Sequence, residues 1–215
     1  MKYPLLVFDW DGTIIDSAAT IVECIRQAAI DAGLPAPEPS RASHVIGLGL
    51  KDALRIAVPE LPPERYLEFA DLYRGHFLAR EDSMQLFGGM RELLAELAGR
   101  HRLAIATGKS RRGLERALQA SGLAALFAAS RCADETSPKP HPAMLLEILD
   151  ELSLRPADAL MIGDTSHDLE MARGAGVAAL AVTYGAHPGP QLAACAPLGC
   201  LPSVAELRAW LTRNA

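Results

Sequence analysis

Short apolar stretches and amphipathic segments alternate along most of this chain. The apolar stretches are typical of strands buried on both faces of a sheet, whereas the segments between them repeat apolar residues every three or four positions, as helices do. Strands that alternate with helices predict an α/β fold with a Rossmann-like core, in which helices cover both faces of a parallel sheet. The predicted strands are residues 5–8, 103–106, 125–128, 159–162 and 177–182.

One long interval lacks this alternation. Residues 16–83 contain no convincing strand pattern, and apolar residues such as Ile21, Ile25 and Ala28 follow one another at helical spacing. We therefore expect residues 16–83 to form an all-helical cap domain inserted after the first strand. Residues 1–15 and 84–215 would then make up the α/β catalytic core.

Charge and cysteine content exclude several classes of protein. The chain has 21 Lys and Arg against 26 Asp and Glu, and this balance of −5 repels nucleic acid and anionic membranes alike. The N-terminal apolar run is too short for a signal peptide or a membrane span. A cytoplasmic protein with no nucleic-acid or membrane partner is expected, because the cysteines are too sparse for a disulfide framework. They are Cys24, Cys132, Cys195 and Cys200.

Polar residues follow three of the predicted strands. The first strand runs into Asp9-Trp10-Asp11-Gly12-Thr13, the strand at 103–106 into Thr107-Gly108-Lys109, and the strand at 159–162 into Gly163-Asp164. Lys139 precedes a helix whose first turn accommodates Pro142. Because the carboxyl ends of parallel strands open into one crevice, these groups should converge there.

Convergence of acidic side chains has an electrostatic cost. Two carboxylates about 4 Å apart repel by roughly 4 kcal/mol at an effective dielectric constant of 20. Asp9, Asp11 and Asp164 therefore need a cation or protons if they meet, and Lys139 alone does not suffice. Hard oxygen ligands, without Cys or His at ligand spacing, indicate Mg²⁺ rather than zinc.

The motifs D-W-D-G-T, T-G-K, K-P and G-D-x-x-x-D occur in this order, with the helical insertion after the first. In this the chain resembles the haloacid dehalogenase-like hydrolase superfamily, and most of all its phosphoglycolate phosphatase group, over roughly residues 4–213. Retention of Asp11 favours phosphate-ester chemistry, since the dehalogenating and phosphonate-cleaving relatives lack this second aspartate. Trp10 and Gly108 depart from the residues common in the group, but both positions chiefly present backbone.

The resemblance implies a role for each motif residue. Asp9 would be the nucleophile that forms an aspartyl-phosphate, and Asp11 would protonate the leaving oxygen and later activate water. Thr107 and the Gly108 N–H would hold the transferring phosphoryl group, while Lys139 would offset the negative charge of phosphate and Asp9.

The resemblance also implies a metal site. Asp9, the Asp11 carbonyl and Asp164 would bind Mg²⁺, and Asp168 would support them from outside the ligand set. Crowding by other acids would raise the pKa of Asp11, as its role as an acid requires.

Candidate contacts in the cap are less specific. The stretch 44–51 holds two glycines that could form a substrate-facing loop, and Lys51 or His44 is a candidate contact for the leaving group, with Lys51 taken as substrate-binding. The competing interpretation of Lys51, a solvated side chain near a helix start, is the more common one. The basic run from Lys109 to Arg116 is interpreted as the solvent face of a helix. The histidines His101, His141, His167 and His187 are scattered and show no metal-ligand spacing.

These patterns lead to three functional hypotheses. The first is a Mg²⁺-dependent phosphatase of a small phosphorylated metabolite, for which the resemblance suggests 2-phosphoglycolate. The second is a sugar-phosphate phosphomutase, which would share the core motifs and differ in its cap. The third is a non-catalytic phosphoacceptor module, against which the helical insertion argues. We expect a small-molecule phosphate ester as the partner and a monomer or weak homo-oligomer.

Overall fold

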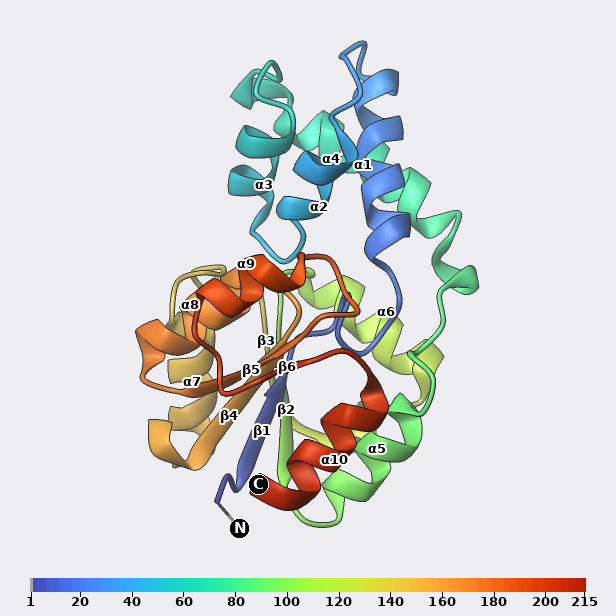
Figure 1. Cartoon of the computed structure of the whole chain (residues 1–215). Coiled ribbons are helices and arrows are strands. Elements are labelled where there is room, and N and C mark those ends of the chain that lie inside the picture. The colour runs from blue at the N-terminus through green and yellow to red at the C-terminus, as the bar shows by residue number, and fades with distance from the viewer. Residues whose placement is uncertain (1) are drawn as a thin grey trace.

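The computed structural model describes residues 2–215. Six parallel strands form one sheet in the order β3-β2-β1-β4-β5-β6 (Figure 1). This parallel sheet between helices confirms the predicted fold class. The strands are β1 (Leu5–Phe8), β2 (Arg102–Thr107), β3 (Phe127–Cys132), β4 (Ala159–Gly163), β5 (Ala178–Val182) and β6 (Cys200–Leu201).

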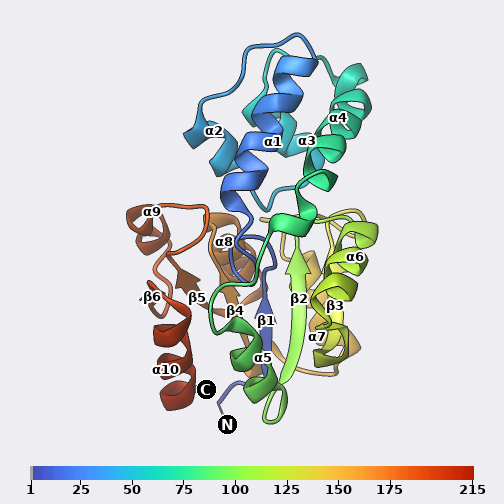
Figure 2. The ribbon, with the colours of Figure 1, turned by 90° about the vertical axis from the view of Figure 1, so that its right-hand side faces the viewer.

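Helices cover both faces of the sheet (Figures 1 and 2). One face packs against α5 (Met90–Ala98), α6 (Arg111–Ser121) and α10 (Val204–Asn214), and the other against α7 (Ala143–Glu151) and α8 (Ser166–Ala175). The helix α9 (Gly189–Ala194) packs against α8 and β5. Short 3₁₀ helices, η3 (Ala124–Leu126) and η4 (Pro156–Asp158), precede β3 and β4.

The alternation of side chains along β1 explains why there are two cores. Leu6 and Phe8 lie in the cluster that α5, α6 and α10 share, whereas Leu5 and Val7 lie in the cluster under α7 and α8. Successive residues of a strand point to opposite faces, so a strand that is apolar at every position belongs in the middle of a covered sheet. β1 is fully buried and has β2 and β4 as its neighbours.

The helical segment, residues 16–83, stands above the carboxyl edge of the sheet (Figure 1). Its helices surround a hydrophobic cluster separate from the two sheet cores. The two chain connections to the sheet run side by side, with an antiparallel bridge between Ile15 and Leu86 and a 2.9 Å hydrogen bond from Asp16 N to Gln85 O. The elements are α1 (Ala18–Asp31), α2 (Pro39–His44), α3 (Leu50–Ala57), η1 (Pro63–Arg65), α4 (Tyr66–Leu78) and η2 (Glu81–Ser83).

The predicted strand at 125–128 is displaced in the structure. Residues Ala124–Leu126 form η3, and β3 begins only at Phe127. β3 is an edge strand that includes Ser130 and Arg131, so its polar residues hide it from a search for apolar runs. β6 at the opposite edge has only two residues and was not predicted. None of the helices within residues 2–215 is long and apolar enough to cross a membrane.

Substitution of two neighbouring leucines on α7 tests which face of this helix belongs to the hydrophobic core. Leu145 is fully buried under the sheet, whereas Leu146 is 45% exposed. We expect Leu145→Ala to lower the free energy of unfolding by about 2–5 kcal/mol, because it removes buried methyl groups and leaves a cavity. Leu146→Ala, which makes the same chemical change on the same helix, should cost less than about 1 kcal/mol. Urea unfolding of both variants measures the difference, and equal losses would contradict the packing.

Candidate active site

The carboxyl ends of three adjacent strands bring the polar motif residues together. Asp9 follows β1, Thr107 ends β2 and Asp164 follows β4. The Asp9 N–H donates to Ile162 O at 2.9 Å and so extends the pairing of β1 with β4 to the edge of the sheet. Gly12 turns the chain there with φ of +80°, and a β-carbon at this position would collide with the Asp164 carboxylate. The turn therefore needs glycine both for its conformation and for space.

Three carboxylates and one ammonium group are buried at this edge. Asp9, Asp164 and Asp168 each offer an oxygen within 4.8 Å of the others. The Lys139 ammonium lies between two of them, with Nζ 2.7 Å from Asp9 Oδ1 and 2.6 Å from Asp168 Oδ1. All four side chains are at most 1% exposed, so water contributes little to balancing their charges.

Burial shifts the protonation of these groups. It raises the pKa of Asp164 to about 7, and the Asp168 carboxylate adds to the shift. It also raises the pKa of Asp9 well above its usual range, against the attraction of Lys139. Burial by itself would lower the pKa of Lys139, but the carboxylates of Asp168 and Asp9 outweigh it and raise that pKa. The Lys139 ammonium group therefore stays protonated, and its single positive charge does not balance the negative charge of three ionised carboxylates.

Hydrogen bonds orient Asp164 and Asp168. Thr13 Oγ1 donates to Asp164 Oδ1 at 2.8 Å, and the Ala186 N–H donates to Asp164 Oδ2 at 2.7 Å. Asp168 belongs to the capping box that begins α8, since its Oδ2 accepts hydrogen bonds from Thr165 N at 3.0 Å and from Thr165 Oγ1 at 2.7 Å. The remaining oxygen of Asp168 faces Lys139.

The residues present fit a hard divalent cation. One ammonium group faces three carboxylates, and Asp9 Oδ2 is buried without a hydrogen-bond partner among residues 2–215. A buried carboxylate oxygen without a partner is costly, and oxygen donors of this kind are those that Mg²⁺ and Ca²⁺ prefer. The aspartate cluster can therefore hold a metal ion.

The structure corrects the expected surroundings of Asp11. Its carboxylate does not join the aspartate cluster but pairs with Lys109, whose Nζ lies 3.1 Å from both oxygens. Ser17 Oγ also donates to Asp11 Oδ1 at 2.9 Å. In place of the expected crowding by other acids, this carboxylate has an ammonium group and a hydroxyl group as partners, at the wall of the cavity described below.

Lys109 is a site residue that the sequence interpretation missed. Its side chain is only 11% exposed, and its Nζ lies 4.6 Å from the centre of the Phe77 ring on α4. The signal was its position directly after Thr107-Gly108, at a strand end and before α6 begins at Arg111. The rest of the basic run starts within the helix, but Lys109 precedes it.

The chain that leaves the end of β2 meets the helical segment at Gly108. Thr107 is fully buried, and its Oγ1 accepts a 3.2 Å hydrogen bond from the Lys109 N–H. A β-carbon on Gly108 would lie 2.7 Å from Gly47 O. The two backbones approach so closely that this position excludes a side chain, which accounts for glycine in the T-G-K motif.

A cavity of about 520 Å³ opens between the helical segment and the sheet edge. Asp9, Asp11, Gly108 and Lys109 are among the residues that line it. Lys51 is not, because it is exposed on the side of α3 that faces away. Leu50, one position earlier, does line the cavity, and successive helical residues are rotated by about 100°.

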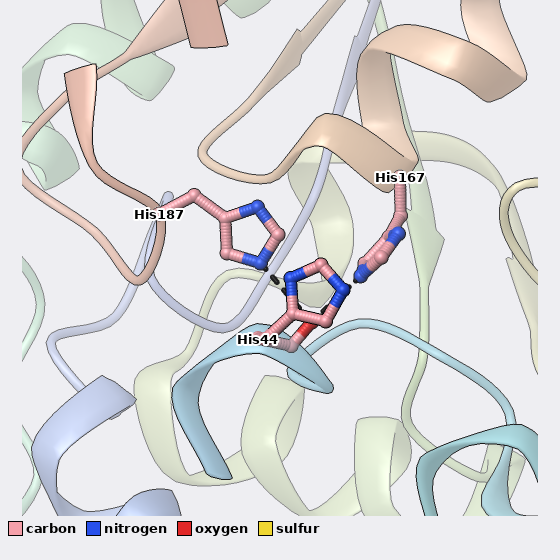
Figure 3. A group of neighbouring side chains, drawn as sticks. All are labelled: His44, His167 and His187. Carbon is pink, nitrogen blue, oxygen red and sulfur yellow. Dashed lines mark hydrogen bonds between the residues drawn. The ribbon is translucent and has the colours of Figure 1, made fainter. Parts of the chain in front are cut away.

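His44 does not reach this cavity either. Its ring lies with those of His167 and His187, at centroid distances of 5.3 and 5.2 Å, in a contact between α2 and the core (Figure 3). Both core histidines lie against the His44 carbonyl oxygen, with Nε2 distances of 2.8 and 3.1 Å. His187 Nδ1 accepts a 3.0 Å hydrogen bond from Ser166 N, so its Nε2 carries the proton that it donates.

This hydrogen-bonding pattern explains the role of the histidine cluster. Burial lowers the pKa of His167, and burial together with His167 lowers the pKa of His187 to about 4. Although the three rings could offer nitrogen atoms within 4.8 Å of one another, both nitrogens of His187 are already engaged. The cluster therefore holds α2 against the core through hydrogen bonds donated by neutral imidazole N–H groups. Sequence spacing did not predict this contact.

Comparisons with known proteins agree with this geometry. The family model described as Haloacid dehalogenase-like hydrolase matches residues 6–182. A Dickeya dadantii protein named Probable phosphatase IndB is 35% identical over 211 residues, which cover 95% of this chain and 91% of that protein. Phosphoglycolate phosphatase of Pectobacterium atrosepticum is 32% identical over 209 residues, with coverage of 94% and 89%.

A solved structure extends the similarity to three dimensions. A haloacid dehalogenase-like family hydrolase from Streptococcus pneumoniae matches with a TM-score of 0.84 and 25% identity, over 98% of this chain and 99% of that one. The family match spans well over half of the chain, and the relatives cover nearly all of it. The chain therefore belongs to the haloacid dehalogenase-like hydrolase family and is an enzyme of the phosphatase type.

Proposed function

We propose that this enzyme is a Mg²⁺-dependent phosphatase that hydrolyses a small phosphorylated metabolite through a phosphoaspartate at Asp9. The observation that carries this proposal is the state of the Asp9 carboxylate. One oxygen is held by Lys139, and the other is buried, has no partner among residues 2–215 and belongs to a side chain that lines the cavity. The relatives named phosphatases support the same reaction class, and one of them is named for phosphoglycolate.

The proposed reaction has two steps. An oxygen of Asp9 attacks phosphorus, the bond to the ester oxygen breaks, and Asp11 gives that oxygen a proton so that an alcohol leaves. Asp11 then takes a proton from water, which attacks the phosphoaspartate and releases inorganic phosphate. Since Lys109 pairs with Asp11 in this structure, the phosphate must first draw Lys109 away before Asp11 can carry a proton.

The neighbouring residues would hold the charge that is transferred. Thr107 and the Gly108 N–H lie beside Asp9 at the sheet edge and are the proposed donors to the phosphoryl oxygens. Lys139 contacts Asp9 directly and would keep its carboxylate ionised and aimed. Asp168 contacts Lys139 from the other side and would fix the position of the ammonium group.

Asp9, Asp164 and the Asp11 carbonyl are the proposed Mg²⁺ ligands. Bound Mg²⁺ would supply positive charge that offsets the carboxylates and the phosphate oxygens. The orientation of Asp164 by Thr13 and Ala186 supports its role as a ligand, since both hydrogen bonds fix the carboxylate before any ion arrives.

The helical segment is the proposed cap domain, with residues 1–15 and 84–215 as the catalytic core. Its separate hydrophobic cluster and the paired connections at Ile15 and Leu86 support this division. A cap over Asp9 would exclude water and contact the organic part of the substrate.

Substitution of the nucleophile tests the reaction. We expect Asp9→Asn to lower kcat for p-nitrophenyl phosphate by more than about 10³-fold, because the amide is a poor nucleophile. Far-ultraviolet circular dichroism should show that the variant stays folded. The matched control is Asp16→Asn, the same change at an exposed residue, which should retain full activity. Turnover by Asp9→Asn at the rate of the control would overturn the mechanism.

Thermal denaturation with and without Mg²⁺ tests the metal site. Because the pKa of Asp164 in the folded protein, about 7, lies above the value of about 3.9 in an unfolded chain, this group stabilises the metal-free fold below pH 4 and loses that contribution as the pH rises through 7. A cation favours the ionised carboxylates, so Mg²⁺ should raise Tm more at pH 8 than at pH 5.5.

The same experiment separates the cluster from general salt effects. Asp164→Asn should lose most of the Mg²⁺-dependent rise in Tm at pH 8, whereas Asp16→Asn should keep it. Chelation should abolish turnover by the unsubstituted enzyme. An equal rise in Tm for Asp164→Asn and the unsubstituted protein would place the metal elsewhere.

A further inference from the structure

The cavity above Asp9 and Asp11 has mostly apolar walls, and the helical segment supplies them. α3 contributes Leu50, Ala53, Leu54 and Ala57, which recur at helical spacing and therefore form one face of the helix. Of these, Leu54 and Ala57 are at most 4% exposed, so the cavity reaches into the interior of the helical segment. Aromatic side chains of α4 form another wall, and they are Phe69, Tyr73 and Phe77.

The size of the cavity bears on the substrate. Its volume of about 520 Å³ lies within the range of roughly 300–1,000 Å³ typical of pockets that enclose drug-sized ligands. A two-carbon glycolate group would leave most of this space unfilled.

The cations that line the cavity lie on α4, on α6 and in the loop before α6, and most of them are already paired. Lys109 pairs with Asp11 at 3.1 Å, Arg116 with Glu81 at 3.3 Å, and Arg74 with Asp71. Arg112 is the lining cation without an ion pair within residues 2–215, and it is exposed.

Within residues 2–215, α1 and α3 contribute only apolar side chains to the lining, so an anionic group placed against these walls would have no partner there. A carboxylate taken into this part of the cavity would lose its hydration and gain no cation in exchange. An apolar group, in contrast, gains from leaving water in the same place. The walls from α1 and α3 thus favour a hydrocarbon group over a charged one.

We propose that the preferred substrate is a monophosphate ester of an apolar alcohol larger than two carbons, whose hydrocarbon part enters the cavity among α1, α3 and α4. This inference rests on the proposed phosphatase function and specifies its substrate class. The phosphate would lie at Asp9, and the hydrocarbon would contact side chains such as Leu54 and Phe69.

A series of straight-chain alkyl monophosphates tests the proposal without any substitution. Ethyl, butyl, hexyl and octyl phosphate have leaving alcohols of nearly equal acidity, so the chemical step stays constant while the buried hydrocarbon grows. We expect kcat/KM with Mg²⁺ to rise by about fourfold for each added methylene until the cavity is full. Ethyl phosphate and phosphoglycolate should both be much poorer substrates than hexyl phosphate.

A pair of phenylalanine substitutions on α3 locates the effect. Ala53→Phe places a ring in the cavity and should lower kcat/KM for hexyl phosphate by more than tenfold while changing that for ethyl phosphate by less than threefold. Arg55→Phe adds the same ring on the exposed side of the same helix and should leave the whole series unchanged.

The outcomes test the substrate class and the phosphatase function separately. Hydrolysis of p-nitrophenyl phosphate without any dependence on alkyl length, or a preference for phosphoglycolate over hexyl phosphate, would overturn the substrate class and leave the phosphatase function intact. Failure to release phosphate from every ester, p-nitrophenyl phosphate included, would overturn the function itself. A length dependence that Ala53→Phe and Arg55→Phe alter equally would place the hydrocarbon outside this cavity.

Discussion

The ammonium group of Lys139, buried between Asp9 and Asp168, is the interaction on which the arrangement of the site depends. Its one positive charge reduces the repulsion among three buried carboxylates, so they can lie close together. It does not neutralise all three. A buried ion pair that loses one partner is strongly destabilising, since the remaining charge has no water to replace it. The loop before α7 and the capping box of α8 are therefore tied to the end of β1 by electrostatics. The charge left unbalanced is what makes the cluster suited to a cation.

The position of the helical segment is coupled to this cluster through one short loop between β5 and α9. The Ala186 N–H holds Asp164 Oδ2 at 2.7 Å, while the Ala186 carbonyl accepts a 2.7 Å hydrogen bond from Ser43 of α2. His187 continues the same contact by donating to the His44 carbonyl. The peptide groups around Ala186 therefore contact both the helical segment and one of the carboxylates of the aspartate cluster.

The rule that parallel strands converge at their carboxyl ends was sufficient to predict from sequence that Asp9, Thr107 and Asp164 share one edge. It could not predict the partner of the Asp11 carboxylate, because that partner is an ammonium group 98 residues away. The histidine contact was hidden for the same reason, since it joins residues 123 and 143 positions apart. Local spacing identifies residues on one element, but it carries little information on contacts between an inserted segment and the core.

The apolar face of α3 illustrates how the fold of the helical segment and its function are connected. In an ordinary helical bundle, residues at the spacing of Leu50, Ala53, Leu54 and Ala57 would pack against a neighbouring helix and leave no space. Here the same face borders the cavity, so part of the hydrophobic driving force that folds the segment is not used by its own side chains. A ligand hydrocarbon that fills the space would complete the interior of the segment. The free energy of binding and the stability of the segment would then be linked, because a ligand that binds only the folded form stabilises that form.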